Sequence, residues 1–293
     1  MTVKKAIIAA GGYGFSLLPA TKALPKEILP VFDRPVIDYL VREAKLAGIT
    51  DILLISGKRK RAIEDYFDAA PELEMSLAEK NKTELMALIK TTTDVNLYFM
   101  KQNNPTGIGD ALLMAEDFVN DEPFVVMLSD DIVDEAHSLT RQLLEDYNQY
   151  QAPVLGIEAL SPQQVSHYGI VSLSETVVAP GLSQIQSIVE KPLPDSAPST
   201  LGVVGRYVLP GDFFQYLKQL PEETTASNQL SLALNLLNAQ TPVLARTFVG
   251  QREDISSKFG LLKASINYGL QSPTFGSEVA AYIKELTNSK RLD

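Results

Sequence analysis

The sequence has no cysteine, only two histidines and no apolar run of membrane-spanning length. Without cysteine, the chain forms neither disulfides nor thiolate metal sites. A membrane helix needs about 20 consecutive apolar residues. The apolar stretch at residues 3–10 is too short for a secretory signal and runs directly into a glycine turn. We therefore expect a cytoplasmic protein with no membrane partner.

An excess of positive charge is also missing. The chain carries 36 acidic and 26 basic residues, which gives a net charge of −10 and a pI of about 4.8. Such a surface repels nucleic-acid backbones, so we expect no nucleic-acid partner. A small anionic ligand would need a local cluster of cations. The first 61 residues contain such a group: Lys4, Lys5, Lys22, Lys26, Arg34, Lys58, Arg59, Lys60 and Arg61.

What the sequence does contain is the composition of a globular protein, with 45% hydrophobic and 21% charged residues in a chain of 293. Apolar runs and helical periodicity alternate along its first half. We expect strands at 5–10, 51–56, 95–100, 124–128 and 153–158, and helices at 36–47, 61–67, 73–89, 108–119 and 138–150. This alternation indicates an α/β fold with a mostly parallel mixed sheet and helices on both faces.

The second half has a different pattern. Residues 168–210 are rich in β-forming sequence, followed by helices at 212–220 and 229–238 and a strand at 243–248. A helical tail fills most of 257–287. Because no boundary in composition separates these parts, we expect one domain over 1–293, with β-insertions and a helical C-terminal arm.

Three polar or glycine-rich segments follow strands in the first half. They are the loop after residue 10, the segment 102–109 and Asp130-Asp131. In parallel sheets, ligands bind beyond the carboxyl ends of the strands, so these segments can converge on one cleft. Each segment also has a simpler interpretation: glycines after a strand are often only a tight turn, and acidic residues there are often turn formers.

The segment 19–30 reads PATKALPKEILP and resembles the signature of the bacterial UTP–glucose-1-phosphate uridylyltransferases. Similarity to that family extends along almost the whole chain. It implies a Rossmann-like nucleotidyltransferase fold and a reaction of UTP with glucose 1-phosphate that gives UDP-glucose and pyrophosphate, assisted by Mg²⁺. It also implies a nucleotide-binding half at about 1–160, a sugar-phosphate half at about 161–256 and the arm at about 257–293.

The resemblance assigns roles to individual residues. Lys26, Lys191 and Asp130 would be catalytic, and Asp130 would hold the metal ion together with Asp254. The nucleotide would lie against Ala10, Gly11, Gly12, Gln102 and Gly107. The sugar phosphate would contact Tyr168, Gly169, Glu190, Lys191 and Gly205. The two histidines, His137 and His167, have no metal-ligand spacing, and we expect no role for them.

The sequence also departs from the family pattern within these motifs. Where the family has Gly-x-Gly-Thr-Arg, this chain has Gly12-Tyr13-Gly14-Phe15-Ser16. A serine offers one neutral hydrogen bond in place of a cation, and the ring of Phe15 could fill space that the triphosphate needs. Lys22 or the cations at 58–61 could compensate. Other departures are Asn103, Asp110, Ser227, Leu232 and Ser256, of which we expect Leu232 to be a helix-packing residue.

These departures leave two functional interpretations open. The first is a UDP-glucose-forming enzyme with reduced activity. The second is a catalytically impaired paralogue that binds nucleotide sugar and regulates an active uridylyltransferase, since the loop resembles that of the family's low-activity copies. Altered substrate specificity is a third possibility. The family forms oligomers through C-terminal helical elements, which implies a homo-oligomer or a hetero-oligomer with an active homologue.

Overall fold

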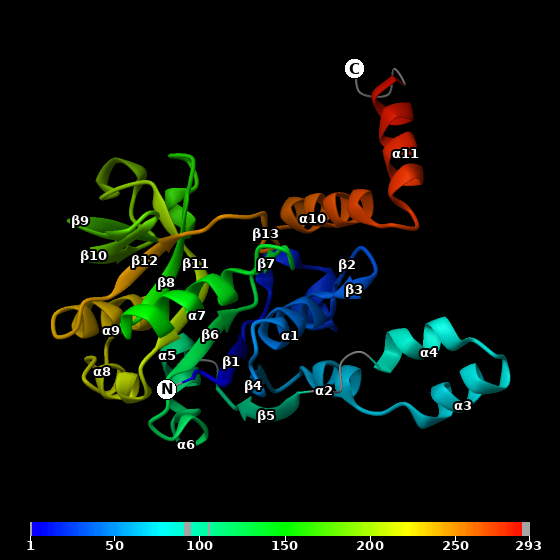
Figure 1. The fold of residues 1–293 in the computed structure, drawn as a ribbon, viewed down its shortest axis with the longest axis horizontal. Coiled ribbons are helices and arrows are strands. Elements are labelled where there is room, and N and C mark those ends of the chain that lie inside the picture. Colours follow the sequence, from blue (N-terminus) through cyan, green and yellow to red (C-terminus); the bar gives the residue numbers. More distant parts are fainter. Residues whose placement is uncertain (1, 91–94, 105, 289–293) are drawn as a thin grey trace.

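The computed structural model describes residues 2–90, 95–104 and 106–288. Its centre is a nine-stranded mixed sheet (Figure 1). The strands follow one another across the sheet in the order β5 (Asn96–Gln102), β4 (Asp51–Gly57), β1 (Lys5–Ala10), β6 (Phe124–Leu128), β11 (Leu201–Leu209), β8 (Val154–Ala159), β12 (Leu244–Thr247), β10 (Leu182–Glu190) and β9 (Gly169–Ala179).

The first half of the sheet is parallel. β1 pairs with β4 and β6, and β5 extends the sheet beyond β4. The strand predicted at 124–128 has the bounds of β6, and the other strands predicted in this half fall within two residues of the observed ends. Because the carboxyl ends of these four strands meet at one edge, the segments that follow them lie close together.

The second half of the sheet is largely antiparallel. β11 pairs antiparallel with β6 and β8, and β10 pairs antiparallel with β12 and β9. Two short ribbons lie outside the sheet, one formed by β7 (Asp131–Val133) and β13 (Arg252–Asp254), the other by β2 (Pro30–Val31) and β3 (Arg34–Pro35). The predicted mixed α/β fold is therefore confirmed, with the expected β-rich second half supplying the antiparallel strands.

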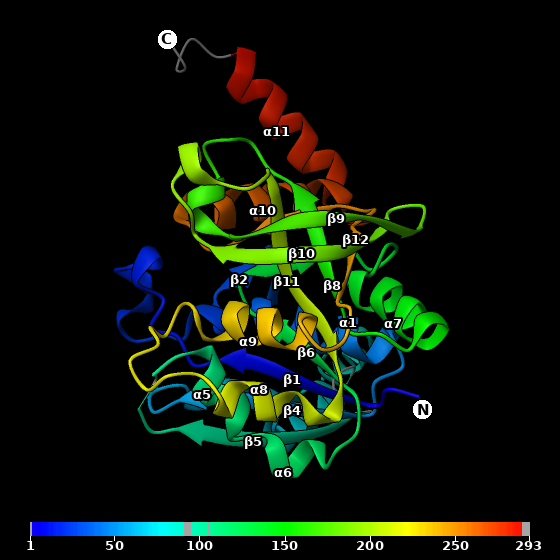
Figure 2. The same ribbon diagram turned by 90° about the vertical axis from the view of Figure 1, so that its left-hand side faces the viewer.

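Helices cover both faces because the strand side chains alternate between two apolar cores. In β1, Ala6 and Ile8 enter one core and Ile7 enters the other. The first core packs against α1 (Val36–Leu46) and α7 (Leu139–Tyr150). The second packs against α5 (Ile108–Leu113), α8 (Phe214–Lys218) and α9 (Gln229–Asn238), which lie in front of the sheet in Figure 2.

Two predicted helices are each divided in the structure. The stretch 73–89 forms α3 (Pro71–Glu79) and α4 (Thr83–Lys90), which project from the body together with α2 (Arg61–Phe67) (Figure 1). Asn81 separates them in a left-handed conformation with φ of 53°. The stretch 108–119 forms α5 and α6 (Glu116–Val119), where Ala115 N–H donates to Leu112 O at 2.8 Å and tightens the turn.

The predicted helical arm is also interrupted. It consists of α10 (Lys258–Gln271) and α11 (Gly276–Asn288), which extend away from the sheet (Figure 1). Ser257 caps α10 by accepting a hydrogen bond from Gly260 N–H at 3.0 Å. Pro273 lies just after α10, where a helix cannot continue through its ring. Over the described part of the chain, no helix has the length and apolarity needed to cross a membrane.

Candidate functional site

The glycine-rich loop begins where β1 ends, and Gly11 has no room for a side chain. A Cβ on Gly11 would lie 2.8 Å from Oε1 of Gln102, and a Cβ on Gly57 would lie 3.1 Å from the carbonyl of Gly11. Gln102 is buried and its Nε2 donates to Gly107 O at 3.4 Å. The predicted nucleotide residues of β1 and β5 are therefore in contact with one another.

The loop then turns sharply away from the strand. Gly14 adopts a left-handed φ of 67°, and Thr21 Oγ1 donates to its carbonyl at 2.7 Å. Tyr13 and Phe15 are 64% and 73% exposed, and their rings stack with centroids 5.3 Å apart. The ring of Phe15, which could fill space that the triphosphate needs, therefore lies exposed against Tyr13. Ser16 hydrogen-bonds through its hydroxyl to the carbonyl of Ser256.

Lys26 and Asp130 form an ion pair at the base of this loop. Burial alone would lower the pKa of Lys26, but Asp130 and Glu27 raise it above its ordinary value. Lys26 is therefore a cation at neutral pH. Asp130 remains half-exposed at the end of β6, so part of its carboxylate faces solvent.

The buried carboxylate of Glu27 lies near this ion pair. Glu27 is fully buried and accepts hydrogen bonds from Lys60 Nζ at 2.8 and 2.9 Å and from Ser129 Oγ at 3.2 Å. Burial lowers the pKa of Lys60, while Glu27 counteracts that shift. Asp130, Lys26, Glu27 and Lys60 thus form a chain of alternating charge from the surface into the interior.

The ribbon of β7 and β13 brings a second acidic group to the same place. Asp131 lies opposite Asp254 in the ribbon, and Ile255 N–H donates to the carbonyl of Asp130 at 2.9 Å. Arg252 Nη1 contacts Asp131 at 2.5 Å, and Arg252 Nε contacts Glu158 at 2.6 Å. Burial would lower the pKa of Arg252, but Asp131 raises it, so the guanidinium stays charged.

Tyr168 closes this network. Its hydroxyl donates to Asp254 and accepts from Arg252 Nη1 at 3.3 Å. Burial raises the pKa of Tyr168, and its hydrogen bond to Asp254 raises it further. The phenol therefore keeps its proton at neutral pH. Hydrogen bonds from Ser256 and Tyr168 outweigh burial at Asp254 and lower the pKa of that carboxyl.

Several of the predicted sugar-phosphate residues lie at or next to the ends of strands. Glu190, the last residue of β10, accepts a hydrogen bond from Ser231 Oγ at 2.6 Å. The next residue, Lys191, has a left-handed φ of 45°, and its backbone N–H donates to Tyr168 O at 2.9 Å. A Cβ on Gly169 would lie 3.0 Å from Glu190 Oε2. These contacts place the carboxylate of Glu190 next to Gly169, the first residue of β9.

Most of these side chains border one cleft of about 620 Å³. Of the predicted site residues, those that line it are Asp130, Tyr168, Gly169, Glu190, Lys191, Gly205 and Asp254. Lys26 reaches the same cleft through its ion pair with Asp130. Ala10, Gly11, Gly12, Gln102 and Gly107 do not line it; Gly11, Gln102 and Gly107 form the adjoining contact described above. His167, for which we expected no role, lies on the cleft wall.

Several residues that shape the cleft were missed in the sequence. Arg206 is fully buried, contacts Glu43 Oε2 at 2.8 Å and donates to the carbonyls of Leu128 and Asp131 at 3.0 and 2.9 Å. The sequence does contain a signal for Arg206, because it is a charged residue inside the otherwise apolar stretch 201–209. Gln229 Oε1 accepts from Gly109 N–H at 2.9 Å, but no local pattern predicts that contact. The expectation for Leu232 was wrong, because it is 40% exposed.

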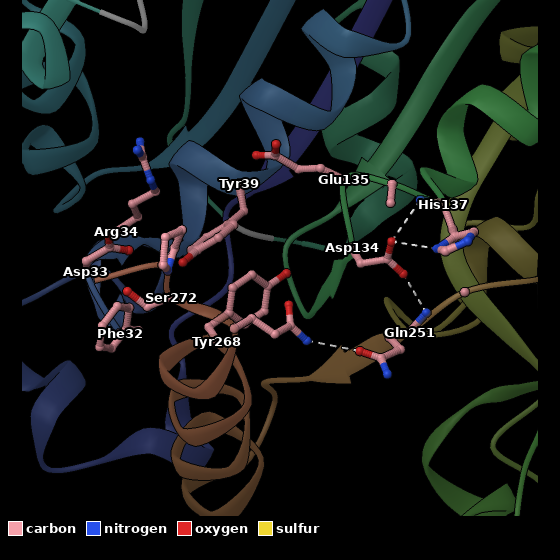
Figure 3. Close-up of a pocket in the computed structure, with 14 residues that line it drawn as sticks. Phe32, Asp33, Arg34, Tyr39, Asp134, Glu135, His137, Gln251, Tyr268 and Ser272 are labelled. Carbon is pink, nitrogen blue, oxygen red and sulfur yellow. Dashed lines mark hydrogen bonds and ion pairs between the residues drawn. The ribbon is translucent and has the colours of Figure 1, made fainter. Parts of the chain in front are cut away.

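A separate hollow of about 610 Å³ lies at the other end of the β7–β13 ribbon (Figure 3). Asp134 accepts hydrogen bonds there from Gln251 N–H at 2.7 Å and from His137 N–H at 2.8 Å, and lies 2.9 Å from the His137 ring nitrogen. Tyr39 from α1 and Tyr268 from α10 both line it, and their rings pack edge to face with centroids 4.8 Å apart. None of the predicted substrate-binding residues lines this hollow.

Proteins of known function resemble this chain along most of its length. Residues 5–268 match the family model described as nucleotidyl transferase. The chain is 44% identical to UTP–glucose-1-phosphate uridylyltransferase 2 of Streptococcus pyogenes serotype M3, over 97% of this chain and 96% of that protein. It is 43% identical to the UTP–glucose-1-phosphate uridylyltransferase of Streptococcus pneumoniae serotype 4, over 98% and 99% of the two chains.

Solved structures give the same result. A UTP-bound UGPase from Acinetobacter baumannii is 39% identical and superposes with a TM-score of 0.89, covering 97% of this chain and 99% of that one. A UDP-glucose pyrophosphorylase complexed with UDP-glucose is 32% identical with a TM-score of 0.81, covering 92% and 100% of the two chains.

Proposed function

Because this chain belongs to the nucleotidyl transferase family and, within it, to the UTP–glucose-1-phosphate uridylyltransferases, we propose that it joins UTP to glucose 1-phosphate. The products would be UDP-glucose and pyrophosphate. The observation that carries this proposal is the cleft that Asp130, Glu190 and Lys191 line together, with Lys26 ion-paired to Asp130. One end of that cleft presents a polar group for sugar hydroxyls, and the other presents charges for phosphates.

The reaction needs positioning and charge neutralisation rather than a covalent intermediate. A phosphate oxygen of glucose 1-phosphate attacks the α-phosphorus of UTP, and the bond from that phosphorus to the oxygen bridging to the β-phosphate breaks. Both phosphates are anionic, so cations that hold them in line lower the barrier. Lys191 is exposed at the cleft and suits the sugar phosphate. Lys26, kept protonated by its acidic neighbours, suits the α-phosphate.

The residues present also fit a magnesium ion. Mg²⁺ is commonly held by one or two carboxylates, with water and substrate phosphate oxygens completing its shell. Asp130 supplies a half-exposed carboxylate, and Asp254 lies on the strand paired to the residue that follows it. Among the described residues, no group of three or more acidic or histidine side chains forms a fuller protein cage. A bound ion would neutralise phosphate charge in the cleft.

A second candidate function rests on the glycine-rich loop. Ser16 contributes no charge, and its hydroxyl is engaged by the carbonyl of Ser256 across the cleft. A protein with this loop would bind nucleotide sugar through Glu190 and Lys191 yet transfer the nucleotide poorly. Such a chain would act as a regulatory partner of an active uridylyltransferase.

The arm supports a proposal that the protein assembles into oligomers. Apolar side chains recur along one side of α10 at intervals of three or four residues, and all are exposed: Phe259, Leu262, Ile266 and Leu270. Such a stripe is expected to pack against another subunit. The surface suits either a second copy of this chain or a homologous active subunit, and sedimentation of wild type and Leu262→Glu distinguishes a self-associated form from a monomer.

The deciding experiment measures pyrophosphate release from UTP, glucose 1-phosphate and Mg²⁺. We expect turnover in the wild type and a loss of about 100-fold or more in Asp130→Ala and in Lys191→Ala, since Asp130 would hold the magnesium ion and Lys191 the sugar phosphate. Lys218→Ala is the matched control, because Lys218 is an exposed lysine paired with Glu116 outside the cleft. If the wild type releases no pyrophosphate but still binds UDP-glucose in calorimetry, the proposed transfer reaction is wrong and the regulatory paralogue is favoured.

A further inference from the structure

The helix α9 contacts both halves of the predicted substrate site from its first turn. Ser231 Oγ donates to Glu190 on the sugar-phosphate side at 2.6 Å. Gln229, the first residue of α9, contacts the nucleotide side, where its Oε1 accepts a hydrogen bond from Gly109 N–H in α5 at 2.9 Å. The helices α5 and α9 lie on the same face of the sheet (Figure 2). One helix is therefore in position to support the binding of both substrates.

The contact between Gln229 and the segment 107–109 is a close one. A Cβ on Gly107 would lie 2.2 Å from Gln229 Oε1 and 2.9 Å from Ala226 Cα. A Cβ on Gly109 would lie 2.7 Å from Gln229 Cβ. Gly107 also has a φ of 138°, which residues with side chains rarely adopt. The backbone of this segment therefore packs directly against the start of α9.

Gln229 supplies an acceptor that α5 itself cannot provide. Gly109 is the second residue of α5, and the first N–H groups of a helix have no acceptor within the helix. Gly109 is also buried, so its N–H depends on the side chain of Gln229 for a partner. An unpaired buried N–H destabilises the conformation that buries it. The hydrogen bond therefore favours the observed position of the segment 107–109 over other positions.

The same segment also contacts a predicted nucleotide ligand. Gln102 Nε2 donates to Gly107 O at 3.4 Å, and its Oε1 faces Gly11 at the end of β1. Gly107 thus contacts two glutamines, Gln102 from β5 and Gln229 from α9. If the segment moved away from α9, the partner of Gln102 would move with it.

We propose that Gln229 is a positioning residue for the nucleotide. It rests on the proposed function that the residues around Gly107 and Gln102 receive the uridine nucleotide. Gln229 acts through Gly109 and holds the segment 107–109 where the nucleotide binds. If the segment kept that position in only about a fifth of the molecules without this hydrogen bond, the apparent affinity for the nucleotide would fall about fivefold. The contact between Ser231 and Glu190 would be unaffected.

The test compares two substitutions that keep the length of the side chain. Gln229→Met fills the same space without a strong acceptor, whereas Gln229→Glu keeps an acceptor oxygen. Calorimetric titration with UDP and with UDP-glucose measures the affinities. We expect Gln229→Met to bind both ligands about fivefold or more weakly, by the same factor, because both contain the uridine nucleotide. Gln229→Glu should bind both within about twofold of the wild type, because an acceptor for Gly109 N–H remains.

Ser231→Ala is the control from the same helix. It removes the hydroxyl that donates to Glu190, so it should weaken the binding of UDP-glucose and leave the affinity for UDP unchanged. Denaturant unfolding checks that each variant is folded under the conditions of the titration. A general loosening of the fold would weaken the binding of UDP in Ser231→Ala and in Gln229→Glu as well.

Four results would overturn the inference: no binding of UDP to the wild type, unchanged UDP affinity in Gln229→Met, an equal loss in Gln229→Glu, or a loss in Gln229→Met that is confined to UDP-glucose. None of these measurements needs turnover, so the positioning role and the transfer reaction can fail separately. A wild type that releases no pyrophosphate, together with the expected pattern of affinities, would refute the transfer reaction and retain the role of Gln229.

Discussion

The two sides of the cleft, which we predict to bind sugar phosphate on one side and nucleotide on the other, are built differently. On the sugar-phosphate side, Tyr168, Arg252, Asp131 and Asp254 form one network of hydrogen bonds and ion pairs, most of it buried. On the nucleotide side, the loop after β1 carries two exposed aromatic rings and a serine bound to a backbone carbonyl. One side is a rigid frame with few free polar groups, and the other is an open loop.

This difference shows where substitutions are tolerated. A change on the sugar-phosphate side leaves a buried charge without its partner, which is costly to stability. A change at residue 15 or 16 alters an exposed loop whose packing does not hold the sheet together. Sequence departures from the family motif can therefore accumulate on the nucleotide side, where they affect chemistry without preventing folding.

The largest effect is expected on the stability of the fold, from a substitution that removes a buried charge beside the cleft. Arg206→Met removes the fully buried guanidinium that neutralises Glu43 and hydrogen-bonds three backbone carbonyls. Glu43 would keep its hydrogen bonds from Thr140 but lose its cation, which should lower the free energy of unfolding by about 3–5 kcal/mol. Denaturant unfolding measures the change. Arg61→Met, at an exposed arginine, should cost less than about 1 kcal/mol, and similar losses in both would contradict the rigid frame.

The next effect tests whether the open loop alone limits catalysis. Phe15→Thr/Ser16→Arg restores the family's residues at two exposed positions, so the fold should be unaffected. An arginine that meets transferring phosphates is worth about 10³–10⁵ in rate in other systems. We expect pyrophosphate release to rise at least about tenfold, with UDP-glucose affinity nearly constant. No gain in rate would mean that the residues at positions 15 and 16 do not limit catalysis.

A smaller effect is expected at the sugar-phosphate side of the cleft surface. Ser231→Ala removes the hydroxyl that donates to Glu190 at 2.6 Å. A hydrogen bond to a charged group is worth about 1.5–3 kcal/mol, less whatever water restores. We expect the KM for glucose 1-phosphate to rise several-fold with the KM for UTP unchanged. Ser227→Ala serves as the control, since Ser227 lines the cleft without contacting Glu190.

The smallest effect concerns the far end of the β7–β13 ribbon, outside both sides of the cleft. Hydrogen bonds from Gln251 and His137 outweigh burial and lower the pKa of Asp134. A lowered pKa means that Asp134 stabilises the fold fully above its ordinary pKa of 3.8 and that this contribution is lost as the pH falls through the lowered pKa of the folded state. Asp134→Asn should therefore cost about 1 kcal/mol at pH 7 and progressively less as the pH falls through that lowered pKa. A cost independent of pH would contradict this assignment.

Much of the fold could be predicted from the sequence. The continuous apolar runs at 5–10 and 124–128 indicated buried strands, and their side chains do enter two cores. The prediction was less reliable at helix boundaries. Residues 73–89 have a helical pattern throughout, but Asn81 takes a left-handed conformation and divides them. Local propensity does not fix such a break, because one residue's backbone angles depend on its surroundings.

The candidate site shows the same division. Its residues could be named in advance wherever they belong to short motifs, as Lys26, Glu190 and Lys191 do, because a motif keeps chemistry and spacing together. The contacts of Gln229 with Gly109 and of Ser231 with Glu190 could not be predicted, since the partners are about 40 to 120 positions apart in the chain. Contacts of that kind have no local signature.

The sequence by itself determined the residue types in the cleft, the strand that delivers each of them and the loss of the loop arginine. Only the tertiary structure decided how charges pair. It paired Glu27 with Lys60 and Arg206 with Glu43, and within the part of the chain that the structure describes it left Lys22, Lys58 and Arg59 without an ion pair around one hollow. The physical reason is that electrostatic effects depend on distance and burial, which appear only when distant segments pack together.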